Sequence, residues 1–227
     1  MSVSARRRTP RDQRRREYGQ NLLADGGVVE RLLPRLGLRA DELVVDVGAG
    51  AGALTVPLAL AGARVLAVER DPAMQRELRA AISRAGVAAR VTVQPADLRR
   101  VRWPLMPYRV VANPPFGLTT ALLSRLLDDP AGALRRADLL LQAEVARKRA
   151  TQPPTSLHSA AWAPWWSFDL GERVDRRAFR PVPRVDAAWL TIRRRDPAVL
   201  PEWLAPGFAD AIRPAWEAGA NAGRPRR

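Results

Sequence analysis

Four consecutive residues, Asn113-Pro114-Pro115-Phe116, have the types and spacing needed to hold a planar amino group. The Asn113 side-chain carbonyl and the next backbone carbonyl can both accept N–H hydrogen bonds, which helps to localise a lone pair that an aromatic ring would otherwise delocalise. Pro114 restricts the turn, so the two acceptors are held in one place. Phe116 offers a face on which an extruded base can stack. We therefore predict catalytic roles for Asn113, Pro114 and Phe116, the alternative being a plain turn with Phe116 in the core.

A second motif, Gly48-x-Gly50-x-Gly52, lies between a predicted strand and a predicted helix. Such a turn fits any nucleotide-binding α/β unit. Its spacing differs from the dinucleotide fingerprint, and Asp46 places a negative charge just before the first glycine. That charge suits a cationic ligand better than a pyrophosphate. S-adenosylmethionine carries both a sulfonium and an ammonium, so it is the cofactor we predict.

Two further carboxylates lie at the ends of the next two predicted strand regions. Glu69 could accept both ribose hydroxyls of the cofactor. Asp97, with Leu98 beside it, could accept a bond from the adenine amino group. The alternatives are that Glu69 pairs with Arg70 and that Asp97 caps the following turn. These residues complete a predicted cofactor site at one edge of the sheet, made of Gly48, Gly50, Glu69, Asp97, Leu98 and Asn113.

The elements that must position these residues alternate along the chain. Apolar runs predict strands at 43–47, 64–69, 90–94, 108–112, 138–142, 165–170 and 187–192, with helices between the earlier ones. We therefore predict an α/β, Rossmann-like fold of the class I methyltransferase type, with a seven-stranded, mostly parallel sheet and helices on both faces. Residues 1–16 form a basic arm, 17–195 the domain, and 196–227 a short helical C-terminal appendage.

The amino-acid composition limits which binding partners and which kinds of site are expected. The 227 residues include 38 basic and 23 acidic ones, a net charge of +15, which favours a polyanionic partner. A GC-rich genome would explain the preference for arginine over lysine, but not this excess. The absence of cysteine and the single histidine, His158, argue against a metal site and a Ser-His-Asp triad. With no apolar span or secretory signal, we expect a cytoplasmic monomer without a membrane partner.

Several segments match one known family. They are Gly19-Gln20-Asn21-Leu22-Leu23, the glycine turn from Asp46, Asn113 to Thr120, Gln142 to Arg147, and Phe179-Arg180-Pro181-Val182-Pro183-Arg184-Val185-Asp186. Over about residues 14–195 the chain resembles the rRNA adenine N6-methyltransferases, most closely the actinobacterial erythromycin-resistance (Erm) enzymes. The resemblance implies that Gln20, Asn21 and Leu23 lie against the cofactor. It also places Glu69 and Asp97 where the family binds ribose and adenine.

The chain departs from the family in three places. Pro114 stands where the family has Ile or Leu, Leu22 replaces Phe, and the chain after residue 195 is shorter than the family's helical C-terminal domain. RNA contacts are therefore expected on the arm and on the loop from Arg176 to Arg184. Trp162, Trp165 and Trp166 are interpreted as alternating core residues of an extended segment, with RNA stacking as the alternative.

The resemblance implies methyl transfer from S-adenosylmethionine to N6 of one adenine in 23S rRNA, in protein-poor or nascent form. The target would lie in the macrolide-binding region, so methylation would confer resistance to macrolides, lincosamides and streptogramin B. Two alternatives stay open. One is a small-subunit rRNA dimethyladenosine transferase, and the other is a non-catalytic rRNA-binding assembly factor.

Overall fold

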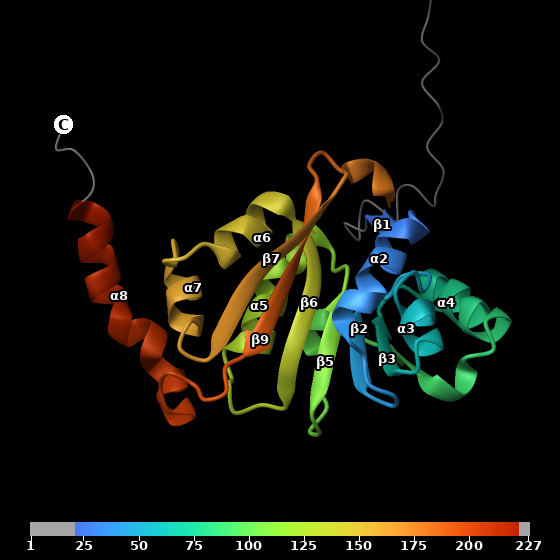
Figure 1. Ribbon diagram of the computed structural model, residues 1–227, viewed down its shortest axis with the longest axis horizontal. Coiled ribbons are helices and arrows are strands. Elements are labelled where there is room, and N and C mark those ends of the chain that lie inside the picture. Colours follow the sequence, from blue (N-terminus) through green and yellow to red (C-terminus); the bar gives the residue numbers. More distant parts are fainter. Residues whose placement is uncertain (1–20, 223–227) are drawn as a thin grey trace, which may run out of the picture.

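The computed structural model describes residues 21–222, so the predicted arm at 1–16 and Gln20 lie outside the described residues. Its main sheet has seven strands in the order β4-β3-β2-β5-β6-β9-β7 (Figure 1). They are β2 (Leu43–Val47), β3 (Arg64–Glu69), β4 (Val91–Pro95), β5 (Tyr108–Ala112), β6 (Leu134–Gln142), β7 (Trp166–Val174) and β9 (Ala187–Arg194). Only β9 runs against the others. The predicted mostly parallel α/β sheet is confirmed.

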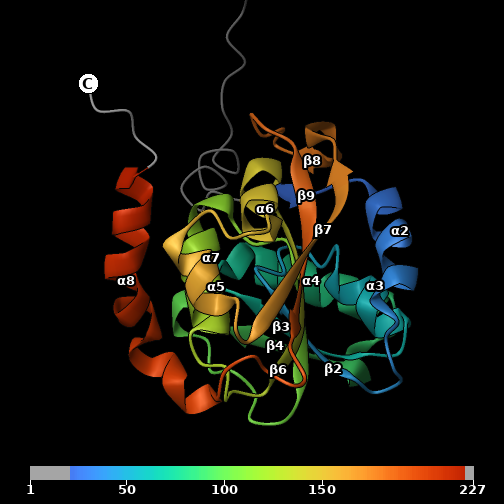
Figure 2. The same cartoon turned by 60° about the vertical axis from the view of Figure 1, so that its left-hand side comes forward.

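Helices cover both faces of this sheet, as predicted (Figures 1 and 2). One face packs on α2 (Gly26–Leu36), α3 (Thr55–Leu60) and α4 (Pro72–Arg84). The other packs on α5 (Thr119–Leu127), α6 (Ala143–Ala150) and α7 (Leu157–Trp162). The central strands separate these two apolar layers, so their side chains are buried on both faces. All five residues of β5, for example, are buried.

One buried ionic network crosses the sheet. Arg109 on β5 donates to the backbone oxygen of Leu36 at 2.7 Å and lies 3.6 Å from the Asp138 carboxylate. Asp138 also accepts two bonds from Arg136 and one from Thr191, each at 2.8 Å. A charge buried inside a core is tolerated only when it is paired and hydrogen-bonded. The network therefore ties β5, β6 and β9 to the end of α2.

A two-stranded antiparallel sheet lies at the edge of the domain and was not predicted. It pairs β1 (Leu22–Leu23) with β8 (Phe179–Arg180), and the Ala24 N–H adds a bond of 2.8 Å to the Ala178 oxygen. Strands of two residues carry no periodicity that a sequence could reveal. This small sheet holds the first described residues against a segment near the end of the domain.

The tryptophan cluster is buried, but the prediction of an extended segment was wrong. Trp162 belongs to α7 and only Trp166 begins a strand. All three indoles are buried, and their N–H groups donate to Asp128, to the Leu200 oxygen and to the Leu127 oxygen. The core interpretation is therefore confirmed, while the alternation proposed for it is not.

The C-terminal appendage is helical, as expected. A 3-10 turn, η5 (Glu202–Leu204), leads into α8 (Ala205–Ala222), which bends at Pro206 and Gly207 and lies beside α7 (Figure 2). Phe208 packs edge-on against Trp165, with ring centroids 5.3 Å apart. Within residues 21–222, none of the helices is both long and apolar enough to cross a membrane.

Gly171 offers a test of the sheet packing. A Cβ at this position would lie 2.9 Å from the Trp189 Cβ and 3.2 Å from the Trp189 oxygen, at the point where β7 and β9 shift register. Gly171→Ala should lower the free energy of unfolding by about 1–3 kcal/mol, because the backbone must move. Gly219→Ala, in open space on α8, is the control and should cost nothing. Urea denaturation measures both, and equal midpoints would contradict the packing argument.

Candidate functional site

The predicted site residues follow strands that are neighbours in the sheet. Gly48 comes directly after β2, Glu69 ends β3, and Asn113 comes directly after β5. Asp97 lies two residues beyond β4. Because the strand order is β4-β3-β2-β5 and these strands are parallel, the four positions lie in a row along one edge.

The glycine turn lies directly against the segment that follows β5. Gly48 has φ +78°, and a Cβ on it would lie 3.3 Å from Pro115 Cδ and 3.8 Å from Pro114 Cα. The Gly48 and Ala49 N–H groups both donate to the Val68 oxygen, at 2.8 and 3.1 Å. Glycine is required here because the φ is left-handed and the neighbouring main chain is close.

The first described residues pack on the same two segments. A Cβ on Gly50 would lie 2.8 Å from Leu22 Cδ2, and Gly50 has φ +55°. Asn113 Nδ2 donates to the Asn21 oxygen at 2.9 Å. The structure therefore brings Asn21 and Leu22 onto both the glycine turn and Asn113, as far as the described residues extend.

The Asn113 carboxamide has one partnered end and one free end. Its Nδ2 is anchored on Asn21, whereas its Oδ1 is buried and has no hydrogen-bond partner within residues 21–222. Buried acceptors are usually satisfied, so an exception calls for a functional explanation. The free oxygen can accept a bond from an incoming N–H group, and the anchored nitrogen fixes its direction.

Phe116 is only partly available. It starts a 3-10 turn, η3 (Phe116–Leu118), and its ring packs edge-on against Phe179 with centroids 6.3 Å apart. Thr119 Oγ1 donates to the Phe116 oxygen at 3.0 Å. The half-buried ring thus contributes to the core, as the alternative interpretation held, and its packing fixes its position beside Asn113.

Two cavities share Gly48. The turn cavity, of about 230 Å³, is lined by Leu22, Leu23, Ala24, Asp46, Gly48, Ala49, Ala51, Ala53, Leu54, Glu77, Asn113 and Arg180. The edge cavity is lined by Gly48, Val68, Glu69, Arg70, Ala96, Asp97, Leu98, Pro115 and Leu118. Of the predicted cofactor residues, Leu23 and Asn113 line the first, while Glu69, Asp97 and Leu98 line the second. Gly50 instead shapes the turn, since its N–H donates to Glu69 Oε2 at 2.9 Å.

Two buried carboxyls lie beneath the turn. Asp46 accepts a bond from Thr55 Oγ1 at 2.6 Å through Oδ2, while its buried Oδ1 has no partner within the described residues. Burial raises the pKa of Asp46 to about 7. Burial also raises the pKa of Glu69, although the N–H groups of Asp71 and Gly50 oppose that effect. Both groups would gain from a nearby cation.

Asp97 is engaged differently from the prediction. Arg99 donates to both of its oxygens, Arg70 donates to Oδ2 at 2.9 Å, and the Arg99 backbone N–H completes a cap of η2 (Leu98–Arg100). The Arg99 guanidinium holds the pKa of Asp97 well below its usual range. The capping alternative thus describes its present contacts, and a ligand amino group would have to share this carboxylate with two guanidiniums.

Arg180 lines the turn cavity, whereas the sequence places it only in a family-like segment and in the loop expected to contact RNA. Its Nη1 donates to the Arg177 and Phe179 oxygens at 2.7 and 2.8 Å, which leaves Nε and Nη2 without a partner inside the described part of the chain. The residue reaches the site because β8 pairs with β1. No local signal could have placed it there, since the pairing joins segments about 160 residues apart.

Comparisons with known proteins agree with this architecture. Residues 11–210 match the family model described as "Ribosomal RNA adenine dimethylase". The chain is 41% identical to the rRNA adenine N-6-methyltransferase of Corynebacterium diphtheriae over 79% of its length and 68% of that protein. It is 38% identical to the mycinamicin-resistance protein MyrB of Micromonospora griseorubida, over 90% of its length and 64% of that protein.

Among solved structures, the 23S rRNA methyltransferase ErmE superposes with a TM-score of 0.74 at 31% identity. The match covers 85% of this chain and 78% of ErmE. The chain spans about two-thirds of the length of the two relatives named above.

The raised pKa of Asp46 predicts how stability varies with pH. The folded pKa is about 7 against an ordinary value of 3.8, so between these values the folded protein holds a proton that the unfolded chain has lost. The free energy of unfolding should therefore fall as pH rises through this window, by up to about 4 kcal/mol.

Asp46→Asn isolates this contribution, because Asn does not titrate. Urea denaturation at pH 4 and pH 7 should show wild type losing stability relative to Asp46→Asn as pH rises. Glu69 is present in both proteins and largely cancels in the difference. If the difference in free energy of unfolding between wild type and Asp46→Asn stayed constant from pH 4 to pH 7, Asp46 would titrate as an ordinary carboxyl.

Proposed function

Because the chain belongs to the ribosomal RNA adenine dimethylase family, we propose that it methylates N6 of an adenine in 23S rRNA, using S-adenosylmethionine. The modification would confer resistance to macrolides, lincosamides and streptogramin B. The observation that carries the proposal is the buried, unpartnered Asn113 Oδ1 beside the glycine turn. The likeness to MyrB and ErmE supports the choice of rRNA and the link to resistance.

The chain's residues fit S-adenosylmethionine. Gly48 and Gly50 let the turn pack closely against Pro115 and Leu22, where a Cβ would lie 3.3 and 2.8 Å from their side chains, and Asp46 keeps one buried oxygen unpartnered within the described residues. We assign the amino-acid end of the cofactor to the turn cavity and the adenosine end to the edge cavity. Its holding residues would be Asn21, Leu23, Asp46, Gly48, Gly50, Glu69, Asp97, Leu98 and Asn113, with Gln20 adjacent in sequence. When bound, the cofactor supplies an electrophilic methyl group.

We assign the target adenine to Asn113, Pro114 and Phe116. Asn113 Oδ1 accepts one amino hydrogen and the Pro114 carbonyl accepts the other, so that the nitrogen lone pair is directed out of conjugation with the ring. Phe116 provides an apolar face for the flipped base, which offsets part of its lost stacking. The N6 proton becomes acidic only once the nitrogen carries the additional methyl group, so no strong base is required.

Arg180 is assigned to the carboxylate of the cofactor's amino-acid end. It is the one basic side chain lining the turn cavity among the described residues, and Asp46 and Glu77 supply the opposite charge for the ammonium. Its Nη1 is held by two backbone oxygens, so the guanidinium is positioned before a ligand arrives.

The proposal is tested with labelled S-adenosylmethionine and protein-free 23S or 16S rRNA as separate substrates. Mass spectrometry of the digested RNA should find N6-methylated adenine in the macrolide-binding region of 23S rRNA. Methylation of 16S rRNA alone would favour the small-subunit dimethyladenosine transferase. Absence of methylation on both, with cofactor binding retained in calorimetry, would favour the non-catalytic assembly factor.

Asn113→Ala should lower the turnover rate by about 100–1,000-fold, because it removes an acceptor that acts on the developing charge. Single-turnover methylation measures this loss, and thermal denaturation checks that the variant folds. Affinity for S-adenosylhomocysteine should change much less than the rate. A rate within a few-fold of wild type would rule out Asn113 as the group that activates the amino nitrogen.

Arg180→Gln should weaken binding of S-adenosylhomocysteine by about 10–100-fold, since a charge-assisted hydrogen bond is lost. Binding of 5′-methylthioadenosine, which lacks the amino-acid group, should not change. Arg184→Gln, in the exposed loop that follows β8 and outside both cavities, is the matched control. Equal losses for the two ligands would show that Arg180 does not read the carboxylate.

A further inference from the structure

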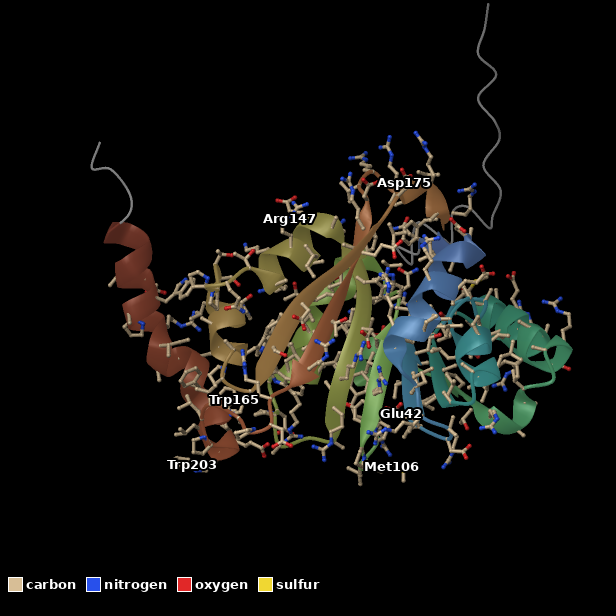
Figure 3. The ribbon with its side chains drawn as sticks, in the orientation of Figure 1. Glu42, Met106, Arg147, Trp165, Asp175 and Trp203 are labelled. Carbon is tan, nitrogen blue, oxygen red and sulfur yellow. The ribbon has the colours of Figure 1, made fainter. Side chains whose placement is uncertain are left out.

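A further cleft, lined by five arginines and three acidic residues, lies at the same edge of the sheet. Its volume is about 520 Å³. We define this arginine cleft by five side chains: Arg147 on α6, Arg173 near the end of β7, Arg176 and Arg177 on the 3-10 turn η4 (Arg176–Ala178), and Arg184 in the following loop. Arg147 and Asp175, two of the residues that line the cleft, lie at the same end of the molecule in Figure 3.

Three acidic residues line the cleft, and two of them, Asp175 and Asp186, hold its backbone, whereas the third, Glu144, is exposed. Asp186 pairs with the Arg173 guanidinium and accepts the Arg176 backbone N–H at 2.9 Å. Asp175 accepts the Arg177 backbone N–H at 2.7 Å and so caps η4. These contacts hold the backbone of the cleft in one shape while neutralising only one of its arginines.

Three guanidiniums of the cleft therefore have no directly paired carboxylate. The side chains of Arg147, Arg177 and Arg184 are exposed and have no ion pair or hydrogen bond inside the described range 21–222. Some exposed arginines elsewhere pair with a carboxylate, as Arg31 and Arg90 do, and others such as Arg79 are also unpaired in the described part of the chain, so the cleft is distinguished by three unpaired guanidiniums on one concave surface. An unpaired cluster on a braced backbone is suited to an external anion with several phosphates.

The cleft is joined to the candidate site. β6 ends at Gln142 beside β5, which ends just before Asn113, and the Ala143 N–H donates to the Asp186 oxygen at 2.9 Å. On the other side, the Arg177 oxygen accepts a bond from Arg180, which lines the turn cavity. The chain segment from η4 to Arg184 thus carries unpaired guanidiniums of the cleft together with Arg180, which lines the turn cavity.

We propose that the arginine cleft binds backbone phosphates of the RNA strand that flanks the adenine presented to Asn113. The inference rests on the proposed function and adds a site to it. The phosphate contacts are made by Arg147, Arg177 and Arg184. The ion pair between Arg173 and Asp186 holds the backbone of the cleft in place. Phosphate contacts fix the register of a nucleic acid without reading its bases. The cleft therefore orients the strand, and base choice is left to the pocket at Asn113.

The test compares two double variants that remove the same charge. Arg177→Gln with Arg184→Gln removes two of the unpaired arginines of the cleft. Arg79→Gln with Arg84→Gln removes two exposed arginines from α4. Binding of protein-free 23S rRNA is measured over a series of KCl concentrations. The cleft variant should bind at least about tenfold more weakly at low salt, with its salt slope reduced by about 0.7–0.9 for each lost phosphate contact. The α4 variant should keep the wild-type slope.

The possible outcomes separate this inference from the proposed function. Wild type that neither binds S-adenosylhomocysteine nor methylates rRNA would overturn the proposed function itself. If wild type methylates rRNA but the cleft and α4 variants bind rRNA equally well, only the proposed role of the cleft would be overturned. Weaker binding with an unchanged salt slope would also overturn it, because the arginines would then not contact phosphates. Unchanged S-adenosylhomocysteine affinity in both variants, together with a higher rRNA KM only in the cleft variant, would support it.

Discussion

The close approach of the glycine turn to the segment after β5 is the constraint on which the site depends. A Cβ on Gly48 would lie 3.3 Å from Pro115, at a φ that disfavours side chains. Only a residue without a side chain lets these two main-chain segments meet. Their contact places the Asn113 carboxamide beside the turn, and it follows from β2 and β5 being parallel neighbours. The donor and acceptor ends of the proposed reaction are thus adjacent because of backbone packing.

The same edge carries an electrostatic cost. Asp46 and Glu69 are both buried, and burial raises the pKa of each. Glu69 is partly compensated by the Gly50 and Asp71 N–H groups, but Asp46 keeps an oxygen without a partner in the described structure. A site of this kind is less stable empty at neutral pH than it would be with a cation bound. The electrostatic cost of burying these carboxylates therefore favours a ligand that carries positive charge, as the proposed cofactor does.

Long-range pairing closes the site and links it to the surface. The β1–β8 sheet brings Asn21, Leu22 and Arg180 to the glycine turn. The backbone that supplies Arg180 continues directly into η4 and the arginine cleft. A change in the cleft that displaced η4 would therefore reach the turn cavity through the Arg180–Arg177 bond. Substitutions in the cleft are best made at side chains that do not brace the backbone.

What the sequence determined by itself is local. Runs of buried apolar residues specified β2, β3 and β5 to the residue, and glycine and carboxylate positions at strand ends supplied most residues of the candidate site. The tertiary structure alone decided which distant segments touch: the β1–β8 pair, Arg180 in the turn cavity and the Arg70 guanidinium on Asp97. The reason is physical. Periodicity records which face of one element is buried, whereas contacts between remote side chains depend on how the elements pack and leave no pattern in the chain.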